Sequence, residues 1–268
     1  MNFFDNIILK RDILGNNSLI ENRMSFHIAF GIDANFTMGT GVLISSILKY
    51  NTDNFVFHIF TDSIHNDDIF RFKQLCNNYK DICIIIYHVN ANNFKNLPTE
   101  YIWTQAIYYR IIACEYLHTL TNTLLYLDSD MLCLSNFGDL FKQNFNSKII
   151  MVVGSIETKD RYIPSLNYNF KNKFYFNSGF IYINLEKWHQ KNISSKFFNL
   201  LTNHNDFKYF DQDVLNILLN DELIPLENFY HQICPLMNSN TQIDLNTKFI
   251  HFAGSTKPWQ AWGGVAII

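Results

Sequence analysis

The chain has 268 residues, enough for one large domain or two small ones, and with 48% hydrophobic and only 17% charged residues it is not an intrinsically disordered chain. A formal net charge of −3 excludes the overall positive field that would hold nucleic acid or an anionic membrane surface. The five cysteines lack C-x-x-C spacing, no apolar run nears the roughly 20 residues that cross a bilayer, and no secretion signal is found, so we expect a reduced, cytoplasmic protein without a transmembrane segment.

Residues 1–22 carry mixed charge without a sustained hydrophobic period, so we interpret them as an N-terminal extension packed outside a domain of residues 23–268. Apolar runs in that domain predict strands at residues 26–32, 55–60, 82–89, 124–127, 149–154 and 180–184. Other stretches predict helices at residues 38–50, 67–79, 104–117, 185–190, 194–203 and 211–219, and a long loop at residues 155–173. The alternation predicts a single α/β domain with a mainly parallel sheet, Rossmann-like, and helices on both faces.

The predicted strand at residues 124–127 runs directly into Asp128, Ser129 and Asp130. Because side chains two residues apart in a strand lie on the same side, the two carboxylates can converge on one point. Carboxylates that close repel each other unless a cation or a proton lies between them, and a hard divalent ion is the usual partner. The stretch therefore predicts half of a metal site. The alternative is a strand followed by an Asp-rich turn, which Asp and Ser both favour.

Polar residues also follow the first predicted strand, where Asp33 and Asn35 succeed residues 26–32. In open sheets of parallel strands ligands bind outside the carboxyl ends, so this pair and the two later aspartates are expected at the same rim. Arg110 lies in an otherwise apolar predicted helix, and a buried arginine needs an anionic partner. In one interpretation the partner is a carboxylate of an internal salt bridge. In the other it is a carboxylate of the rim or a bound anionic ligand.

Taken in order, these elements resemble glycosyltransferase family 8, and most closely its bacterial lipopolysaccharide glucosyltransferases and galactosyltransferases. The resemblance extends from His27 to Trp262. Its motifs are weak alone but specific in their order and spacing; they are residues 30–36, 109–110, the D-x-D motif within 124–130, 176–179, 211–213 and 251–259. The resemblance implies a GT-A fold, a single mixed α/β domain. It also implies a retaining hexosyltransferase that moves glucose or galactose from a UDP-sugar to a lipopolysaccharide core oligosaccharide.

Carried over position by position, the resemblance assigns residues to the nucleotide and to the sugar. Asp33 and Asn35 would hold the uridine, and Gly254 and Lys257 would contact the diphosphate. The sugar pocket would be lined by Arg110, Asn177, Asp211 and Gln212. By position Gln212 is nearest the anomeric carbon, and because an amide is a poor nucleophile we favour a same-face substitution in which Gln212 and Asp211 orient the sugar. Asp211 also has a structural interpretation, as the N-cap of a helix.

The resemblance assigns the metal to Asp128, Asp130 and His251, with the diphosphate completing its coordination. A Lewis-acidic ion offsets the negative charge that builds on departing UDP without supplying a proton. A histidine ligand favours Mn2+ over Mg2+, the other candidate, because imidazole is a softer donor than Mg2+ prefers. A lone histidine at a strand end is more commonly a core residue, and that is the alternative for His251.

Lipopolysaccharide enzymes of family 8 continue into a basic, aromatic C-terminal segment that contacts the membrane, whereas residues 263–268 contain no basic residue. This departure implies a truncated chain or a shorter relative. Peripheral contact with the inner face of the inner membrane is then weakened.

Two other functions fit parts of the sequence. A haloacid-dehalogenase-type phosphatase also places D-x-D after an apolar strand, but it has Thr or Val where this chain has Leu132, and it has the motif near its start. A non-catalytic module that binds nucleotide sugars or glycans would keep the pocket without turnover. Tight binding without UDP release would distinguish that module from a transferase.

Overall fold

The structure is a computed structural model that describes residues 4, 6–100, 103–155, 162–170, 174–234 and 242–260. Trp262 and the C-terminal residues 263–268, on which the expectation about membrane contact depends, lie outside the described residues. Among the described helices, none has the length and apolar character that crossing a bilayer requires. All five cysteines are buried and unpaired, as predicted.

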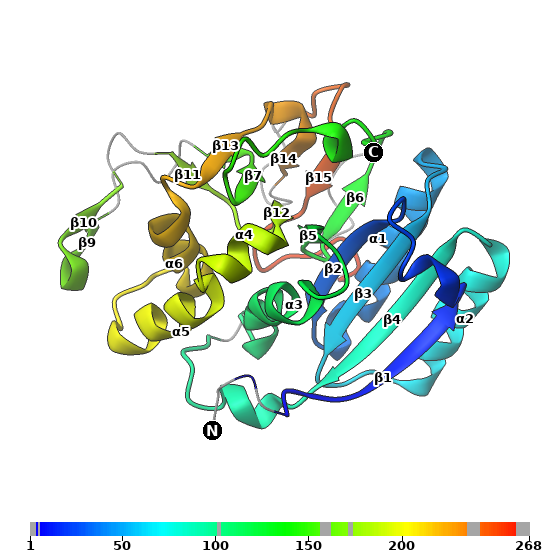
Figure 1. Cartoon of the computed structure of the whole chain (residues 1–268), viewed down its shortest axis with the longest axis horizontal. Helices are drawn as coiled ribbons and strands as arrows, with labels where there is room; N and C mark the ends of the chain where they lie inside the picture. The colour runs from blue at the N-terminus through cyan, green and yellow to red at the C-terminus, as the bar shows by residue number, and fades with distance from the viewer. Residues whose placement is uncertain are drawn as a thin grey trace.

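Within the described ranges the main sheet has eight strands, and it runs through the middle of the molecule (Figure 1). Their order is β1 (Ile8–Gly15), β4 (Ile82–Val89), β3 (Phe55–Thr61), β2 (Phe26–Ile32), β5 (Thr123–Leu127), β12 (Phe180–Asn184), β7 (Ile150–Val152) and β13 (Leu223–Pro225). The strands from β4 to β5 are parallel, as are β7 and β13, whereas β1 and β12 run antiparallel to their neighbours. The predicted mixed, mainly parallel sheet is confirmed.

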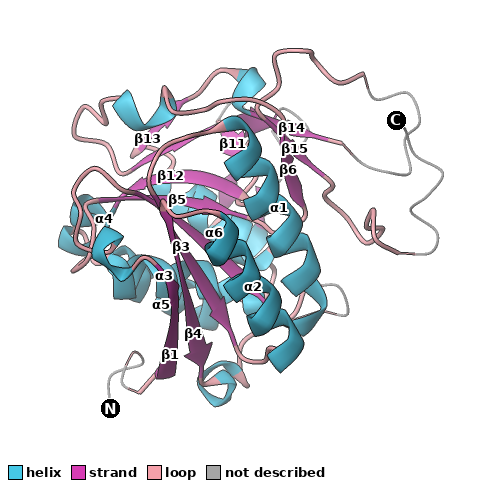
Figure 2. Cartoon of the chain, turned by 90° about the vertical axis from the view of Figure 1, so that its right-hand side faces the viewer, coloured by secondary structure: helices cyan, strands magenta, loops and turns pink. Residues whose placement is uncertain are grey.

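Helices cover both faces of this sheet (Figure 2). The buried side chains form two cores, one on each face. One face is covered by α1 (Thr37–Tyr50) and α2 (Asn66–Asn78). The other is covered by α3 (Tyr109–Leu117), α4 (Leu185–Gln190), α5 (Ile193–Asn203) and α6 (Phe210–Leu219). Because side chains alternate along a strand, β2 contributes Ile28 and Phe30 to the first core and Ala29 to the second. Burial on both faces explains why the predicted central strands are continuous apolar runs.

A smaller sheet brings distant parts of the chain to the carboxyl end of β5. The strand that follows the two aspartates is β6 (Met131–Cys133), and it pairs antiparallel with β15 (Phe249–His251). β15 pairs in parallel with β14 (His231–Ile233). The register sets His251 opposite Met131, and therefore next to the aspartate pair. Two short pairs join β8 (Gly154–Ser155) to β11 (Tyr175–Phe176) and β9 (Tyr162–Ile163) to β10 (Tyr168–Asn169).

Two predicted segments differ from the structure. The helix predicted for residues 104–117 begins as a 3-10 turn (Gln105–Tyr108) and only then becomes α3. The extension predicted for residues 1–22 contains β1, which is an edge strand of the main sheet and so belongs to the domain. Most side chains of β1 are exposed, and Lys10, Arg11 and Asp12 interrupt it. Charges of this kind protect an open edge, and they also remove the apolar pattern that would have predicted a strand.

Candidate active site

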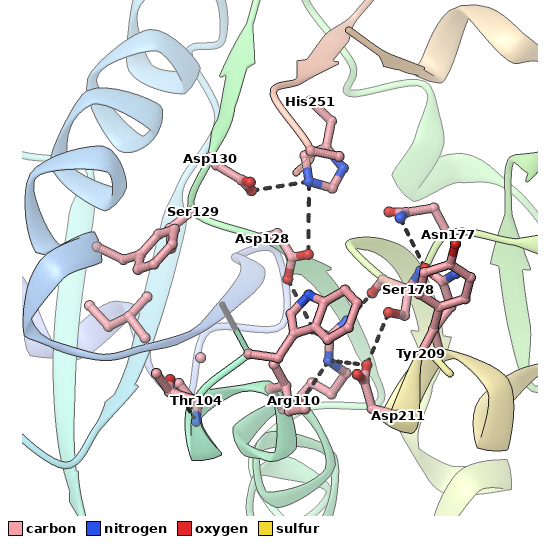
Figure 3. Close-up of a pocket in the computed structure, with 18 of the residues that line it drawn as sticks. Thr104, Arg110, Asp128, Ser129, Asp130, Asn177, Ser178, Tyr209, Asp211 and His251 are labelled. Carbon is pink, nitrogen blue, oxygen red and sulfur yellow. Dashed lines mark hydrogen bonds and ion pairs between the residues drawn. The ribbon is translucent and has the colours of Figure 1, made fainter. Parts of the chain in front are cut away.

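A cleft of about 380 Å3 opens at the carboxyl ends of β2 and β5 (Figure 3). Its walls also include the start of α3, the turn before β12, the first turn of α6 and the segment after β15. The volume lies in the range of pockets that bind small molecules. All but one of the predicted site residues line it: Asp33, Arg110, Asp128, Asp130, Asn177, Asp211, Gln212, His251, Gly254 and Lys257.

Asp128, Asp130 and His251 converge in this cleft, and their potential ligand atoms lie within 4.8 Å of one another. His251 Nε2 is 3.0 Å from Asp130 Oδ1 and 3.9 Å from Asp128 Oδ2 (Figure 3). The aspartates also form the turn between β5 and β6, as the alternative interpretation of the pair predicted. His251 is buried, but it faces the carboxylates rather than the apolar core. Two carboxylates and one imidazole form a donor set suited to a divalent ion.

Gly179, in the turn before β12, lies against two of these side chains. A Cβ atom at this position would be 2.5 Å from Asp128 Oδ2 and 2.7 Å from His251 Cε1. The Gly179 carbonyl accepts the backbone N–H of Asp128 at 2.8 Å. The turn therefore fixes Asp128 from one side, and any side chain at position 179 would displace the aspartate or the histidine.

A second histidine orients the first. His231, on β14, is buried, and its Nε2 is 3.0 Å from Nδ1 of His251. Burial holds the pKa of His231 well below its ordinary value, so this ring is neutral. When His231 Nε2 accepts the proton of His251 Nδ1, the lone pair of His251 Nε2 points at the two carboxylates. That tautomer is the one that metal ligation requires.

Two buried cations balance the carboxylates. Lys257 Nζ donates to Asp130 Oδ2 at 2.5 Å, and Arg110 Nη2 donates to Asp128 Oδ1 at 3.1 Å. Arg110 Nε is also 3.2 Å from Asp211 Oδ2, so its sequence-predicted anionic partner is a carboxylate of the rim. Burial raises the pKa of Asp130, but contacts with His251 and Lys257 outweigh it and hold this pKa well below its ordinary value. Burial likewise opposes the charge of Arg110, whose pKa is nevertheless raised by Asp128 and Asp211.

The first turn of α6 carries Asp211 and Gln212 into the cleft. Gln212 Oε1 accepts hydrogen bonds from Asn177 Nδ2 at 3.0 Å and from the backbone N–H of Ser178 at 3.1 Å. Ser178 Oγ donates to Asp211 Oδ2 at 3.0 Å. Burial raises the pKa of Asp211 to about 6, with Arg110 opposing this rise and Asp128 adding to it. The amide and the carboxylate are both fixed by neighbouring groups.

The interpretation of Asp211 as an N-cap is wrong. The N-cap of α6 is Tyr209, and Asp211 is the second residue of the helix. Asp213 Oδ2 instead accepts the backbone N–H groups of Lys208 and Tyr209, each at 3.0 Å. Asp213 thus holds the segment just before the helix, and Asp211 contacts Arg110 and Ser178.

Asp33 lines the cleft, whereas Asn35 does not. The Asp33 carboxylate accepts the N–H of Asn35 at 2.9 Å and the hydroxyl of Thr104 at 3.0 Å. Asn35 is exposed and lines a neighbouring, more open cavity of about 360 Å3. The cleft also contains Gly254, whose φ of 108° lies in the left-handed region that favours glycine.

Sequence reasoning missed several residues of the cleft. Ser178 holds Asp211 and Gln212, and it lies inside the motif at residues 176–179, which could have indicated it. Trp103 and Tyr209 form an aromatic wall, with ring centroids 5.9 Å apart. No spacing pattern relates these two aromatic residues, because they come from separate loops.

A mixed α/β sheet whose central strand ends in an Asp-x-Asp pair at a small-molecule cleft is the GT-A fold of glycosyltransferases. The solved structure of the galactosyltransferase LgtC in complex with donor and acceptor sugar analogs has this fold. It matches with a TM-score of 0.74 and 22% sequence identity over 88% of this chain and 90% of that one. The bifunctional glycosyltransferase WbbM matches with a TM-score of 0.72 and 17% identity over 90% of this chain and 48% of that one.

The chain belongs to glycosyl transferase family 8, whose family model matches residues 27–263. It is 37% identical to the lipopolysaccharide glucosyltransferase WaaO of Escherichia coli (strain K12), over 88% of this chain and 73% of that protein. It is 34% identical to the lipopolysaccharide 1,3-galactosyltransferase of Salmonella typhimurium, over 99% of this chain and 82% of that protein. The resemblance of the sequence is thus confirmed, the chain is a glycosyltransferase, and the phosphatase alternative does not fit this family.

Proposed function

We propose that this enzyme transfers glucose or galactose from a UDP-sugar to a lipopolysaccharide core oligosaccharide, with retention at the anomeric carbon. The observation that carries the proposal is the convergence of Asp128, Asp130 and His251 within 4.8 Å in the cleft. The names of the similar proteins, which are lipopolysaccharide glucosyltransferases and a galactosyltransferase, support these donors and this acceptor. We also propose that the reaction takes place at the cytoplasmic face of the inner membrane.

The donor set in the cleft fits Mn2+ better than Mg2+, because an imidazole joins the two carboxylates. An ion held by Asp128, Asp130 and His251 would neutralise negative charge on the departing UDP. Lys257 and the backbone at Gly254 lie in the same wall, where they would contact the diphosphate. Asp33, at the end of β2, would hold the uridine, with Asn35 contributing from the rim.

Neither Asp211 nor Gln212 is arranged as an attacking group. The Gln212 amide accepts two hydrogen bonds and donates one to Tyr175 Oη at 3.0 Å, and Asp211 is paired with Arg110. We therefore propose a same-face substitution. The sugar–phosphate bond breaks, the acceptor oxygen bonds to the anomeric carbon from the same face, and its proton passes to the departing diphosphate oxygen. Asp211 and Gln212 orient the sugar, and their dipoles and charge support an oxocarbenium-like transition state.

The test is a donor screen that measures UDP release from UDP-glucose and UDP-galactose, with and without a lipopolysaccharide core acceptor. Release should occur with one donor, increase with acceptor, stop when a chelator is added and return with Mn2+. The anomeric configuration of the product, read by NMR, tests retention. Tight donor binding without release would identify a non-catalytic module, and release that is insensitive to chelator would remove the metal assignment.

A further inference from the structure

A second group of metal-ligating side chains lies outside the cleft, where α3 and α4 pack side by side (Figures 1 and 2). Glu115 and His118 lie at the C-terminal end of α3, and His189 lies on α4. The potential ligand atoms of these three residues are within 4.8 Å of one another. We propose that Glu115, His118 and His189 bind a divalent transition-metal ion of the Zn2+ type, separate from the ion of the active site.

The helices explain why the three side chains meet. Glu115 and His118 are three residues apart, a spacing that sets two side chains on the same face of a helix. His189 reaches this face from α4, and its Nδ1 is 3.8 Å from Glu115 Oε1. The ligands therefore come from two packed helices, and an ion bound there would join them.

The hydrogen bond of His118 selects the tautomer that binds metal. Its Nδ1 is 2.6 Å from the backbone carbonyl oxygen of Glu115. A carbonyl oxygen only accepts hydrogen bonds, so Nδ1 carries the proton and Nε2 of the neutral ring keeps a free lone pair. A backbone carbonyl behind the imidazole is a common partner of ligating histidines.

Local charge also favours a cation at this position. The last carbonyl groups of α3 give the C-terminal end of the helix a partial negative charge, to which the Glu115 carboxylate adds. Lys187 in α4 and Lys191 at its C-cap have other partners. Lys187 Nζ contacts Gln190 at 3.3 Å, and Lys191 Nζ pairs with Glu222 at 2.5 Å.

The present ring arrangement indicates which movement binding requires. The imidazoles of His118 and His189 are stacked, with centroids 3.8 Å apart and planes 8° from parallel. Stacked rings hold their lone pairs in parallel planes, so the His189 ring must turn about its outer side-chain torsion to face an ion shared with His118, while His118 keeps its hydrogen bond to Glu115. That torsion is broad in energy, and 49% of the His189 side chain is exposed, so the rotation meets little resistance.

Ligand chemistry decides the class of metal. Two imidazole nitrogens and one carboxylate oxygen form a set found around Zn2+, with a fourth position left for water. Mg2+ and Ca2+ prefer oxygen ligands and bind such a set poorly. Because the site is at the surface, that fourth position is open to solvent.

The test counts Zn2+ ions bound per chain after equilibrium dialysis of chelator-treated protein. Wild type should bind one more equivalent than His189→Ala or His118→Ala. His65→Ala, which removes an exposed histidine at the start of α2, should bind as wild type. Asp130→Asn should lose only the equivalent of the cleft. Equal binding by wild type and His189→Ala, or loss of all bound Zn2+ in Asp130→Asn, would overturn the proposal.

A second measurement excludes any contribution from the cleft. In the Asp130→Asn background, saturating Zn2+ should raise the unfolding midpoint by about 5 °C, because ligand binding stabilises the folded chain. Adding His189→Ala should abolish that rise, because the site then lacks one of its ligands. An unchanged rise in the double variant would contradict the site. Among the described residues no hydrogen bond, ion pair or ring contact joins His189 to the cleft, so His189→Ala alone should keep the UDP release of wild type. That result separates this test from the test of the proposed function.

Discussion

Asp128 and Asp130 are one residue apart, yet the protein surrounds them differently. The Asp130 side chain is 8% exposed and lies between His251 and Lys257, whereas the Asp128 side chain is 27% exposed and faces Arg110. The contacts of Asp130 hold its pKa well below its ordinary value although burial opposes them. Asp130 is therefore ionised throughout the physiological range, and it is the more informative of the two aspartates to replace.

Asp130→Asn should lower metal-dependent UDP release by at least about 100-fold, because several kcal/mol of charge stabilisation in the transition state are lost with the ion. Asparagine has nearly the same shape, so circular dichroism should show an intact fold. Asp67→Asn, at an exposed carboxylate of α2, is the control and should retain full release. Unchanged activity of Asp130→Asn would remove the metal assignment.

Gly179→Ala tests the crowding beside the metal ligands. The new Cβ would lie 2.5 Å from Asp128 Oδ2, so the carboxylate has to move and the affinity for Mn2+ should fall by about tenfold or more. Titration calorimetry with Mn2+ measures the effect. Gly41→Ala is the matched control, since its nearest contact would be an ordinary 3.8 Å to Phe72. Equal affinities of the two variants would show that Asp128 does not ligate the ion.

His231 should act on the metal through the orientation of His251. His231→Phe removes the acceptor at 3.0 Å from His251 Nδ1, and Mn2+ affinity should fall by about 10–100-fold. His231→Gln keeps an oxygen acceptor and should recover part of the loss. A merely structural role predicts no such rescue, so equal Mn2+ affinities of the two variants, with equal unfolding midpoints, would exclude the orienting role.

A row of buried polar side chains connects β2, β3 and β4. His27 Nδ1 and His58 Nε2 are 2.9 Å apart, and His58 Nδ1 is 2.9 Å from Tyr87 Oη. Burial lowers the pKa of His27 to about 4 and that of His58 well below its ordinary value, and His27 adds to the shift of His58. Both rings are therefore neutral in the folded protein at pH 7, and the row joins three strands without burying a charge.

Acid should destabilise the fold through this row. Below pH 6.5 the unfolded chain protonates both histidines, whereas the folded chain does not protonate His27 until about pH 4. Each histidine should therefore lower the free energy of unfolding by up to about 1.4 kcal/mol per pH unit between those values. In His58→Gln one of the two histidine contributions is gone. The free energy of unfolding, measured with urea between pH 7 and pH 5, should therefore fall less steeply with decreasing pH than in wild type. Equal pH dependence in the two proteins would show that His58 does not contribute to acid destabilisation.

At the level of the whole molecule, the sequence predicts those parts whose signal is local. The central strands are buried on both faces and appear as unbroken apolar runs, so β4 and β12 have the bounds predicted for them. The Asp-x-Asp pair is likewise visible, because its two members are separated by a single residue directly after an apolar run. The motifs of family 8 then place most of the remaining cleft residues.

Other features depend on partners that are distant along the chain, and local patterns do not reveal them. β1 is stabilised by pairing with β4, but its own residues are mostly exposed. The bridge that Arg110 makes between Asp128 and Asp211 depends on how α3, β5 and α6 pack. The contact of His231 with His251 exists because β14 and β15 pair in parallel, and neither strand has a long apolar run.

The pairing of β15 with β6 also determines when the site is completed as the chain is synthesised. Synthesis begins at the N-terminus, so the strands that precede Asp33 and Asp128 leave the ribosome before His251 and Lys257. A nascent chain that has only the aspartates lacks both the imidazole and the ammonium that complete their charge balance. The proposed metal site therefore gains its third ligand only after β15 has paired with β6, so a nascent chain that stops before His251 cannot assemble it.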